Sequence, residues 1–92
     1  MKSNLKKLEQ LEEILSISNY IVRYEKGNFQ SGWCLLEHQK IVILNKFLLI
    51  DDRIIILEDL IPQLDIIKVK LPPNLTELYQ QLLQAKQLLF SS

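Results

Sequence analysis

The apolar residues of this chain change their spacing at Tyr20, and this change limits the order of elements that the chain can form. Before that point, apolar residues recur every three or four positions, at Leu5, Leu8, Leu11, Ile14 and Leu15. This spacing is typical of a helix with one apolar face, and Ser3 or Asn4 can cap its start. From Tyr20 onward the period becomes two, which is the period of a β-strand. We therefore expect an N-terminal helix followed by a sheet.

Three strands are expected over residues 20–45. Gly27-Asn28 predicts a tight turn after the first strand, because both residues tolerate a positive φ. A second strand over residues 31–37 follows, and His38-Gln39 can supply a two-residue connection. The run Ile41-Val42-Ile43-Leu44 has no polar alternation, which predicts a third strand that is covered on both faces. The expected sheet is a three-stranded antiparallel meander.

Two helices are expected after the sheet. Asp51 can cap a helix over roughly residues 52–61, although the β-branched run from Ile54 to Ile56 also allows a strand there. Asn74 and Glu77 can form a capping box for a last helix. The predicted fold class is α+β, in a single domain that spans the 92 residues. Its meander is flanked by an N-terminal helix and two C-terminal helices.

The middle helix is apolar on more than one side, and this feature leads to the first functional hypothesis. A helix of this kind is either buried on several sides or lends one side to a partner. The chain is 48% apolar, and obligate interfaces resemble a protein core cut in half. We therefore predict a non-catalytic interaction or structural protein, which forms a homodimer or binds another protein. The predicted interface residues are Ile54, Ile55, Leu57, Leu60 and Ile61.

The charges balance, with 11 Lys and Arg residues against 11 Asp and Glu residues and a formal net charge of +0. Proteins that bind nucleic acids usually carry a basic excess, because phosphate neutralisation supplies much of their affinity, so this balance argues against that class. The amphipathic start differs from a signal peptide, and no run approaches the ~20 apolar residues of a membrane span. Cys34 is the only cysteine, which excludes an intrachain disulfide. We expect a cytoplasmic protein.

The sequence offers few groups for catalysis or metal binding. Cys34 and His38 lie four residues apart, and in a strand this separation is about 13 Å, so they cannot meet without a bend. Structural zinc needs four ligands and catalytic zinc needs three protein ligands. Glu58 and Asp59 are adjacent on the middle helix, so their side chains point about 100° apart and do not form an acid/base pair. We expect no catalytic, metal-binding or cofactor-binding residue, and no enzymatic activity.

Two alternative hypotheses use the aromatic and basic residues near the predicted first turn. Aromatic side chains flanked by cations can stack unpaired bases, which would make this region a single-stranded nucleic-acid-binding surface. A small-ligand site is the other alternative, in a pocket between the sheet and the helices lined by Tyr20, Tyr24, Trp33 and His38. The residues predicted to contact a ligand or nucleic acid are Arg23, Tyr24, Phe29, Trp33 and His38.

Residues 32–61 resemble the core of the ImmA/IrrE-type bacterial metallopeptidases. In that family, strands lead to a helix that carries Arg, three residues, a small or apolar residue and then His-Glu-x-x-His. Here the matching residues are Leu44-Asn45, then Arg53, then Leu57-Glu58-Asp59-Leu60-Ile61-Pro62. The first His of the motif falls on Glu58, its Glu on Asp59 and its second His on Pro62, so both zinc-binding histidines are missing. The resemblance therefore implies a catalytically inactive relative, whose helix has a structural or partner-binding role.

Residues 24–34 also resemble a run in small bacterial proteins of unknown function, with Tyr-Glu-Lys-Gly-Asn-Phe followed by Ser-Gly-Trp-Cys. This second resemblance implies no function.

Overall fold

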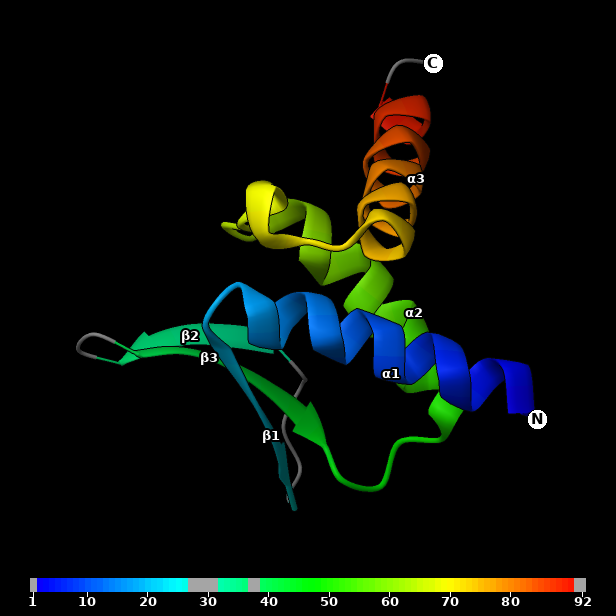
Figure 1. The fold of residues 1–92 in the computed structure, drawn as a ribbon. Helices are drawn as coiled ribbons and strands as arrows, with labels where there is room; N and C mark the ends of the chain where they lie inside the picture. Colours follow the sequence, from blue (N-terminus) through cyan, green and yellow to red (C-terminus); the bar gives the residue numbers. More distant parts are fainter. Residues whose placement is uncertain (1, 27–31, 37–38, 91–92) are drawn as a thin grey trace.

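The computed structural model describes residues 2–26, 32–36 and 39–90, with the side chains of residues 4–26 and 39–86 (Figure 1). The elements follow the order of an α+β fold, and the described residues form three α-helices, which confirms the predicted number. They are α1 (Lys2–Ile17), β1 (Tyr20–Glu25), β2 (Gly32–Leu36), β3 (Gln39–Asn45), α2 (Ile50–Leu60) and α3 (Pro73–Phe90). Two short 3₁₀ turns, η1 (Ile61–Gln63) and η2 (Lys68–Lys70), lie between α2 and α3.

The sheet is mixed, and the predicted three-stranded antiparallel meander is wrong. The strand order is β1-β3-β2. β1 runs parallel to β3, with Tyr20 opposite Lys40, and β2 runs antiparallel to β3, with Trp33 opposite Val42. The strands on either side of Gly27-Asn28 therefore do not pair with each other, and those two residues lie outside the described part of the chain.

The apolar character of β3 explains its central position. A central strand is shielded on both edges, and its side chains are buried on both faces when helices and loops cover the sheet. Val42 and Leu44 are fully buried, and Ile41, which points to the opposite face, is 2% exposed. The prediction that this strand is covered on both faces is thus confirmed for Ile41, Val42 and Leu44. A meander would instead have placed residues 31–37 in the centre.

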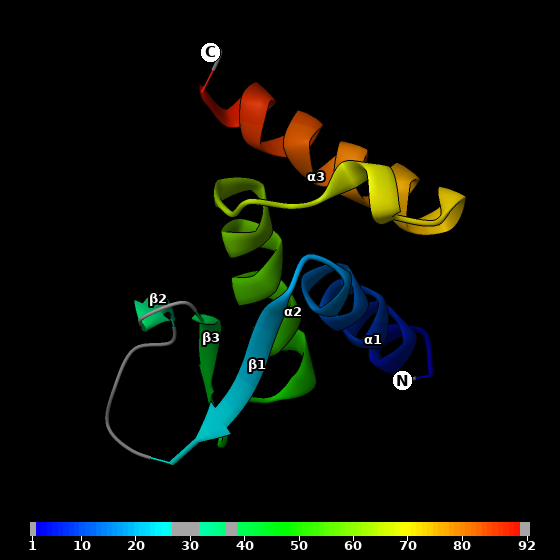
Figure 2. The ribbon, with the colours of Figure 1, turned by 60° about the vertical axis from the view of Figure 1, so that its left-hand side comes forward.

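The helices cover one face of the sheet. In Figures 1 and 2, α1 and α2 lie against that face, and α3 lies beyond α2, farther from the strands. The main core forms between these layers, and its fully buried members include Leu11, Ile14, Leu15, Val42, Leu44, Leu57, Ile61 and Leu75. α3 contacts α1, α2 and η1. The fold is therefore a small sheet with one face hidden by helices.

The corner between α1 and β1 depends on Asn19. Its φ of 68° is the left-handed conformation that ends many helices, and asparagine tolerates this conformation better than most residues. The Ser18 N–H donates to Ile14 O at 3.2 Å, and the Asn19 N–H donates to Ser16 O at 3.1 Å, which closes the last turn of the helix. The chain then enters β1 beneath α1.

The start of α2 differs from the prediction by two residues. Its first helical residue is Ile50, and its N-cap is Leu49, which makes no side-chain cap hydrogen bond. Asp51 and Asp52 both lie in the first turn, where carboxylates favour the positive end of the helix dipole. The side chain of Asp51 instead accepts a hydrogen bond from the Asn4 side chain at 2.8 Å. Asp51 therefore links α2 to α1 and does not cap α2.

Residues 64–67 are tied to the corner between α1 and β1. The Asp65 N–H donates to the Tyr20 hydroxyl at 3.0 Å, and the Ile67 N–H donates to the Ser18 hydroxyl at 3.0 Å. After η2 the chain reaches α3, whose first residue is Pro73. Proline suits this position, because the first N–H of a helix has no partner within it.

Candidate functional site

The structure places the predicted interface residues of α2 mostly inside the protein. Ile54, Leu57 and Ile61 belong to the main core, and Leu60 is partly buried against it. Ile55 is the exception, with 61% of its surface exposed. The apolar sides of α2 are therefore used largely by the fold itself, since α1, the sheet and α3 surround the helix.

The residues predicted to contact a ligand or nucleic acid do not form one described surface. Arg23 and Tyr24 are neighbours on β1, so their side chains point to opposite faces of the sheet. Arg23 is exposed and forms an ion pair with Glu25 at 2.7 Å. Trp33 lies on β2, at the opposite edge of the sheet from β1. Phe29 and His38 lie outside the described residues.

Tyr20 supports the structure rather than lining an open pocket. Its side chain is 7% exposed, and its hydroxyl accepts the hydrogen bond from the Asp65 backbone. The Lys40 ammonium lies 5.2 Å from the centre of the Tyr20 ring and 3.9 Å from the Asp65 carboxylate. These contacts fix the chain after η1 against the sheet.

A cluster of Glu12, Tyr24 and Arg53 joins α1, β1 and α2. The Tyr24 hydroxyl donates a hydrogen bond to the Glu12 carboxylate, and the Arg53 guanidinium lies 4.8 Å from the centre of the Tyr24 ring. Burial is the largest cause that raises the pKa of Tyr24, followed by the hydrogen bond to Glu12 and its negative charge, while Arg53 acts in the opposite direction. The tyrosine is thus held as a neutral donor between an acidic and a basic side chain.

Arg53 also fixes residues 46–49, which join β3 to α2 and are called the connector below. Its Nε donates to Leu48 O at 3.0 Å, and its terminal nitrogen donates to Lys46 O at 3.0 Å. The Phe47 N–H donates to the Asn45 side-chain oxygen at 3.0 Å, and the Leu48 N–H donates to Asn45 O at 3.2 Å. An arginine can hold two carbonyls at once because its donors form a rigid planar fork. The connector therefore has a defined backbone conformation.

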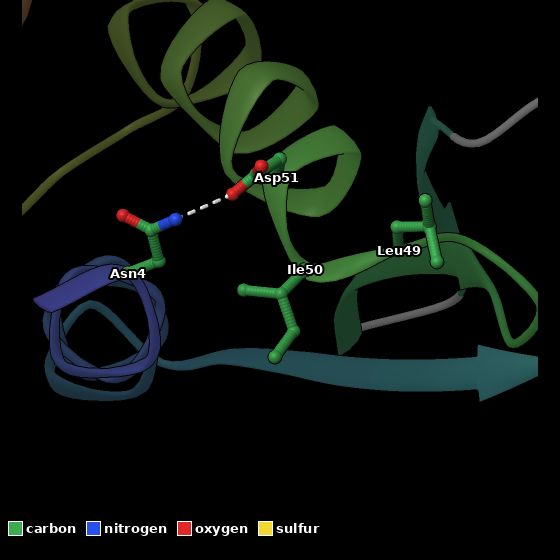
Figure 3. Close-up of a pocket in the computed structure, with 4 residues that line it drawn as sticks. All are labelled: Asn4, Leu49, Ile50 and Asp51. Atoms are coloured by element: carbon green, nitrogen blue, oxygen red, sulfur yellow. Dashed lines mark hydrogen bonds between the residues drawn. The ribbon is translucent and has the colours of Figure 1, made fainter. Parts of the chain in front are cut away.

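The connector carries large apolar side chains that face solvent. Phe47 is 72% exposed and Leu49 is 74% exposed, and Ile50 at the start of α2 is also exposed. Leu49 and Ile50 line an open hollow with Asn4 and Asp51 (Figure 3). Exposed Leu5 follows Asn4 on α1. We call Leu5, Phe47, Leu49 and Ile50 the connector patch.

The hollow has a shape and lining that suit a surface contact better than an enclosed ligand. Its volume is about 290 Å³, slightly below the roughly 300–1,000 Å³ of pockets for drug-sized ligands. The Asn4 amide and the Asp51 carboxylate, its polar groups, already bond to each other at 2.8 Å (Figure 3). They leave few free polar groups to orient a small molecule.

Two acidic residues in the second half of α2 form ion pairs with neighbouring helices. Glu58 forms an ion pair with Lys7 of α1 at 2.6 Å, and Asp59 forms one with Lys86 of α3 at 3.8 Å. These two carboxylates fall at motif positions in the resemblance to metallopeptidases, and each faces a lysine from a different helix. Among the described residues, no three His, Cys, Asp or Glu side chains come close enough together to hold a metal ion.

Sequence reasoning missed the connector patch. Four consecutive apolar residues, from Phe47 to Ile50, follow the polar pair Asn45-Lys46. A run of this kind between two elements was a usable signal, because exposed segments seldom contain four apolar residues in succession. The family resemblance includes Arg53, but the contacts of this residue depend on distances that sequence spacing does not reveal.

Within the described part of the chain, none of the helices is both long enough and apolar enough to cross a membrane. Comparisons of the chain with models of protein families, with curated proteins and with solved structures find no match.

Proposed function

We propose that this chain is a non-catalytic protein-interaction module that self-associates, and that the connector patch is its contact surface. The observation that carries the proposal is the combination of exposure and order in the connector. Phe47 and Leu49 project into solvent from a backbone that Arg53 fixes through two carbonyl groups.

This combination favours binding for an energetic reason. Burying a leucine or phenylalanine side chain stabilises an interface by about 1.5–3 kcal/mol, and aromatic residues are enriched at the centres of interfaces. A flexible loop would lose part of this gain, because binding would have to order it. The connector is already ordered, so less free energy is lost when a partner covers Phe47 and Leu49.

Sedimentation equilibrium over a range of protein concentrations tests the proposal. We expect the average mass of the wild type to rise above that of one chain, and a Phe47→Ser/Leu49→Ser variant to remain at the mass of one chain. Both side chains lie outside the core, so the variant should retain its helical circular dichroism. A wild-type mass that stays at one chain up to about 100 µM would contradict self-association.

Two further variants locate the contact surface. Val69→Ser removes an apolar side chain from η2 that is even more exposed than Phe47 and Leu49, since Val69 is 92% exposed, and this variant should associate like the wild type. Ile55→Ser removes the exposed residue of the α2 interface that the sequence predicts. If Ile55→Ser abolished association and the Phe47→Ser/Leu49→Ser variant did not, the contact surface would lie on α2 and not on the connector.

A further inference from the structure

We propose that Glu12 of α1 controls the conformation of the connector, through Tyr24 of β1 and Arg53 of α2. The inference adds a means of regulation to the proposed contact surface. It rests on the proposed function in one respect only, which is that a change in the connector changes the affinity of the connector patch.

The Arg53 end of the cluster acts on the connector directly. Its Nε donates to Leu48 O at 3.0 Å, and its terminal nitrogen donates to Lys46 O at 3.0 Å. Both hydrogen bonds require the guanidinium to stay in one place, because its donors are fixed in a planar fork. An arginine side chain has several rotatable bonds, so it keeps this place only while another group restrains it. The connector conformation therefore depends on the group that restrains Arg53.

The Tyr24 ring supplies this restraint. The Arg53 guanidinium lies 4.8 Å from the ring centre, within the ~6 Å over which the face of an aromatic ring attracts a cation. The backbone of Tyr24 is fixed, because it pairs in the sheet with Leu44, which is fully buried. The Tyr24 side chain is only half-buried, so it retains a freedom of movement that its backbone lacks. The position of the ring is thus the adjustable part of the cluster.

Glu12 holds the ring by its hydroxyl end. The Tyr24 hydroxyl donates a hydrogen bond to the Glu12 carboxylate, and a bond to a charged acceptor is stronger than one between neutral groups. This bond orients the ring. It also polarises the phenol toward the carboxylate, which makes the ring more attractive to a cation. Loss of the Glu12 carboxylate should therefore weaken the hold of the ring on Arg53 and, through Arg53, the hold on the connector.

Thermodynamic linkage makes this control reciprocal. A partner that covers the connector patch favours the ordered connector, so it also favours the contacts of Tyr24 with Glu12 and Arg53 by the same free energy. Glu12 lies outside the connector patch, yet its loss should lower the affinity for that partner.

Hydrogen exchange of the connector amides, measured by NMR, tests the control by Glu12. We expect Glu12→Ala to raise the exchange rates of the Phe47 and Leu48 amides about threefold or more, after correction for the change in global stability. Glu12→Gln keeps an acceptor oxygen without the charge, so it should raise these rates less. In an Arg53→Met background, Glu12→Ala should change the rates by less than about 1.5-fold, because the connection through Arg53 is already lost.

Glu13→Ala is the matched control. Glu13 is exposed at the next position of α1, and its substitution makes the same change in charge and in helix propensity, so it should leave the connector amides unchanged. The Asp65 amide, which donates to the Tyr20 hydroxyl, should follow only the global stability in every variant. The control by Glu12 would be overturned if Glu12→Ala acted no more strongly than Glu13→Ala, or acted equally with and without the arginine.

Sedimentation equilibrium separates this inference from the proposed function. We expect Glu12→Ala to raise the dissociation constant for self-association about threefold, and Glu13→Ala to leave it unchanged. Faster connector exchange in Glu12→Ala, in a protein that stays at the mass of one chain, would remove the proposed function and leave the control by Glu12 standing. Normal self-association with unchanged exchange would do the reverse. Faster exchange with an unchanged dissociation constant would show that the contact surface is not the connector patch.

Discussion

Residues 46–49 and residues 64–67 are both irregular and rich in apolar side chains. The apolar side chains of residues 64–67 are mostly turned toward the core, whereas those of residues 46–49 are mostly turned toward solvent. In the second segment Leu64 is 7% exposed and Ile66 packs against the core. In the first, Phe47 and Leu49 are largely exposed. In both segments, a side chain from a neighbouring element fixes the backbone by hydrogen bonds.

The comparison shows that a segment can have an ordered backbone without burying its side chains. Tyr20 and Ser18 hold residues 64–67 against the core, so hydrogen bonding and burial stabilise that segment together. Arg53 holds the connector from α2 while its apolar side chains stay outside. The exposure of Phe47 therefore does not result from a loosely packed loop. It is a feature of an ordered surface, as expected for a surface that another molecule covers.

The largest expected contrast is between Leu64→Ala and Leu49→Ala. Leu64→Ala should lower the free energy of unfolding by about 2–4 kcal/mol, because it leaves a cavity in the core. Leu49→Ala should change it by no more than about 0.5 kcal/mol at concentrations where the protein is a monomer, because the side chain is already in water. Urea unfolding followed by circular dichroism measures both. Equal losses of unfolding free energy would show that Leu49 packs against the fold. The two segments would then not differ in the burial of their side chains.

A smaller effect is expected when the support of the connector is removed. Arg53→Met should lower the free energy of unfolding by about 1–2 kcal/mol, through the loss of two hydrogen bonds and of the cation–π contact with Tyr24. The Phe47 and Leu48 amides should then exchange hydrogen faster. Arg53→Lys keeps the charge but lacks the planar fork, so it should protect these amides less than arginine does.

Hydrogen exchange measured by NMR also provides the control for this experiment. The Asp65 and Ile67 amides depend on Tyr20 and Ser18, so their local protection should be independent of Arg53. We expect their exchange to change only as far as global stability changes. Unaltered exchange at Phe47 and Leu48 in Arg53→Met would show that Asn45 alone orders the connector.

The sequence predicts the elements of this fold better than their pairing. Periodicity locates the three α-helices and three strands, because it follows directly from which side chains must be buried. The pairing of β1 with β3 required a different signal. The continuous run from Ile41 to Leu44 predicted a strand covered on both faces, but the short connections led to a prediction of pairing in chain order. The apolar character of the strand was the better guide.

The candidate site was less predictable, because it depends on contacts between distant residues. Glu12, Tyr24 and Arg53 lie on three different elements, and no spacing in the sequence shows that they meet. The apolar excess of α2 led to an interface prediction at Ile54, Leu57 and Ile61, which the fold uses for its own core. Exposure of an apolar residue depends on the packing of the whole chain, so local pattern alone does not reveal it.

A smaller loss of stability than for Arg53→Met is expected when the Tyr24 hydroxyl is removed, and the size of this loss depends on pH. Burial and Glu12 raise the pKa of Tyr24 above its ordinary value, so the native state holds this proton more tightly than the unfolded chain does. The resulting stabilisation is complete below the unfolded pKa of about 10. It is lost as the pH rises through the folded value.

Tyr24→Phe should therefore have two effects. At pH 7 it removes the hydrogen bond to Glu12 and should lower the free energy of unfolding by no more than about 1 kcal/mol. Above about pH 10 the free energy of unfolding should fall less steeply with pH in the variant than in the wild type.

Burial also raises the pKa of Tyr79, so Tyr79→Phe should reduce the alkaline slope as well. Because Tyr79 is on α3, only Tyr24→Phe should also quicken hydrogen exchange in the connector, by loosening Arg53. An alkaline slope unchanged in Tyr24→Phe would mean that folding does not raise the pKa of Tyr24.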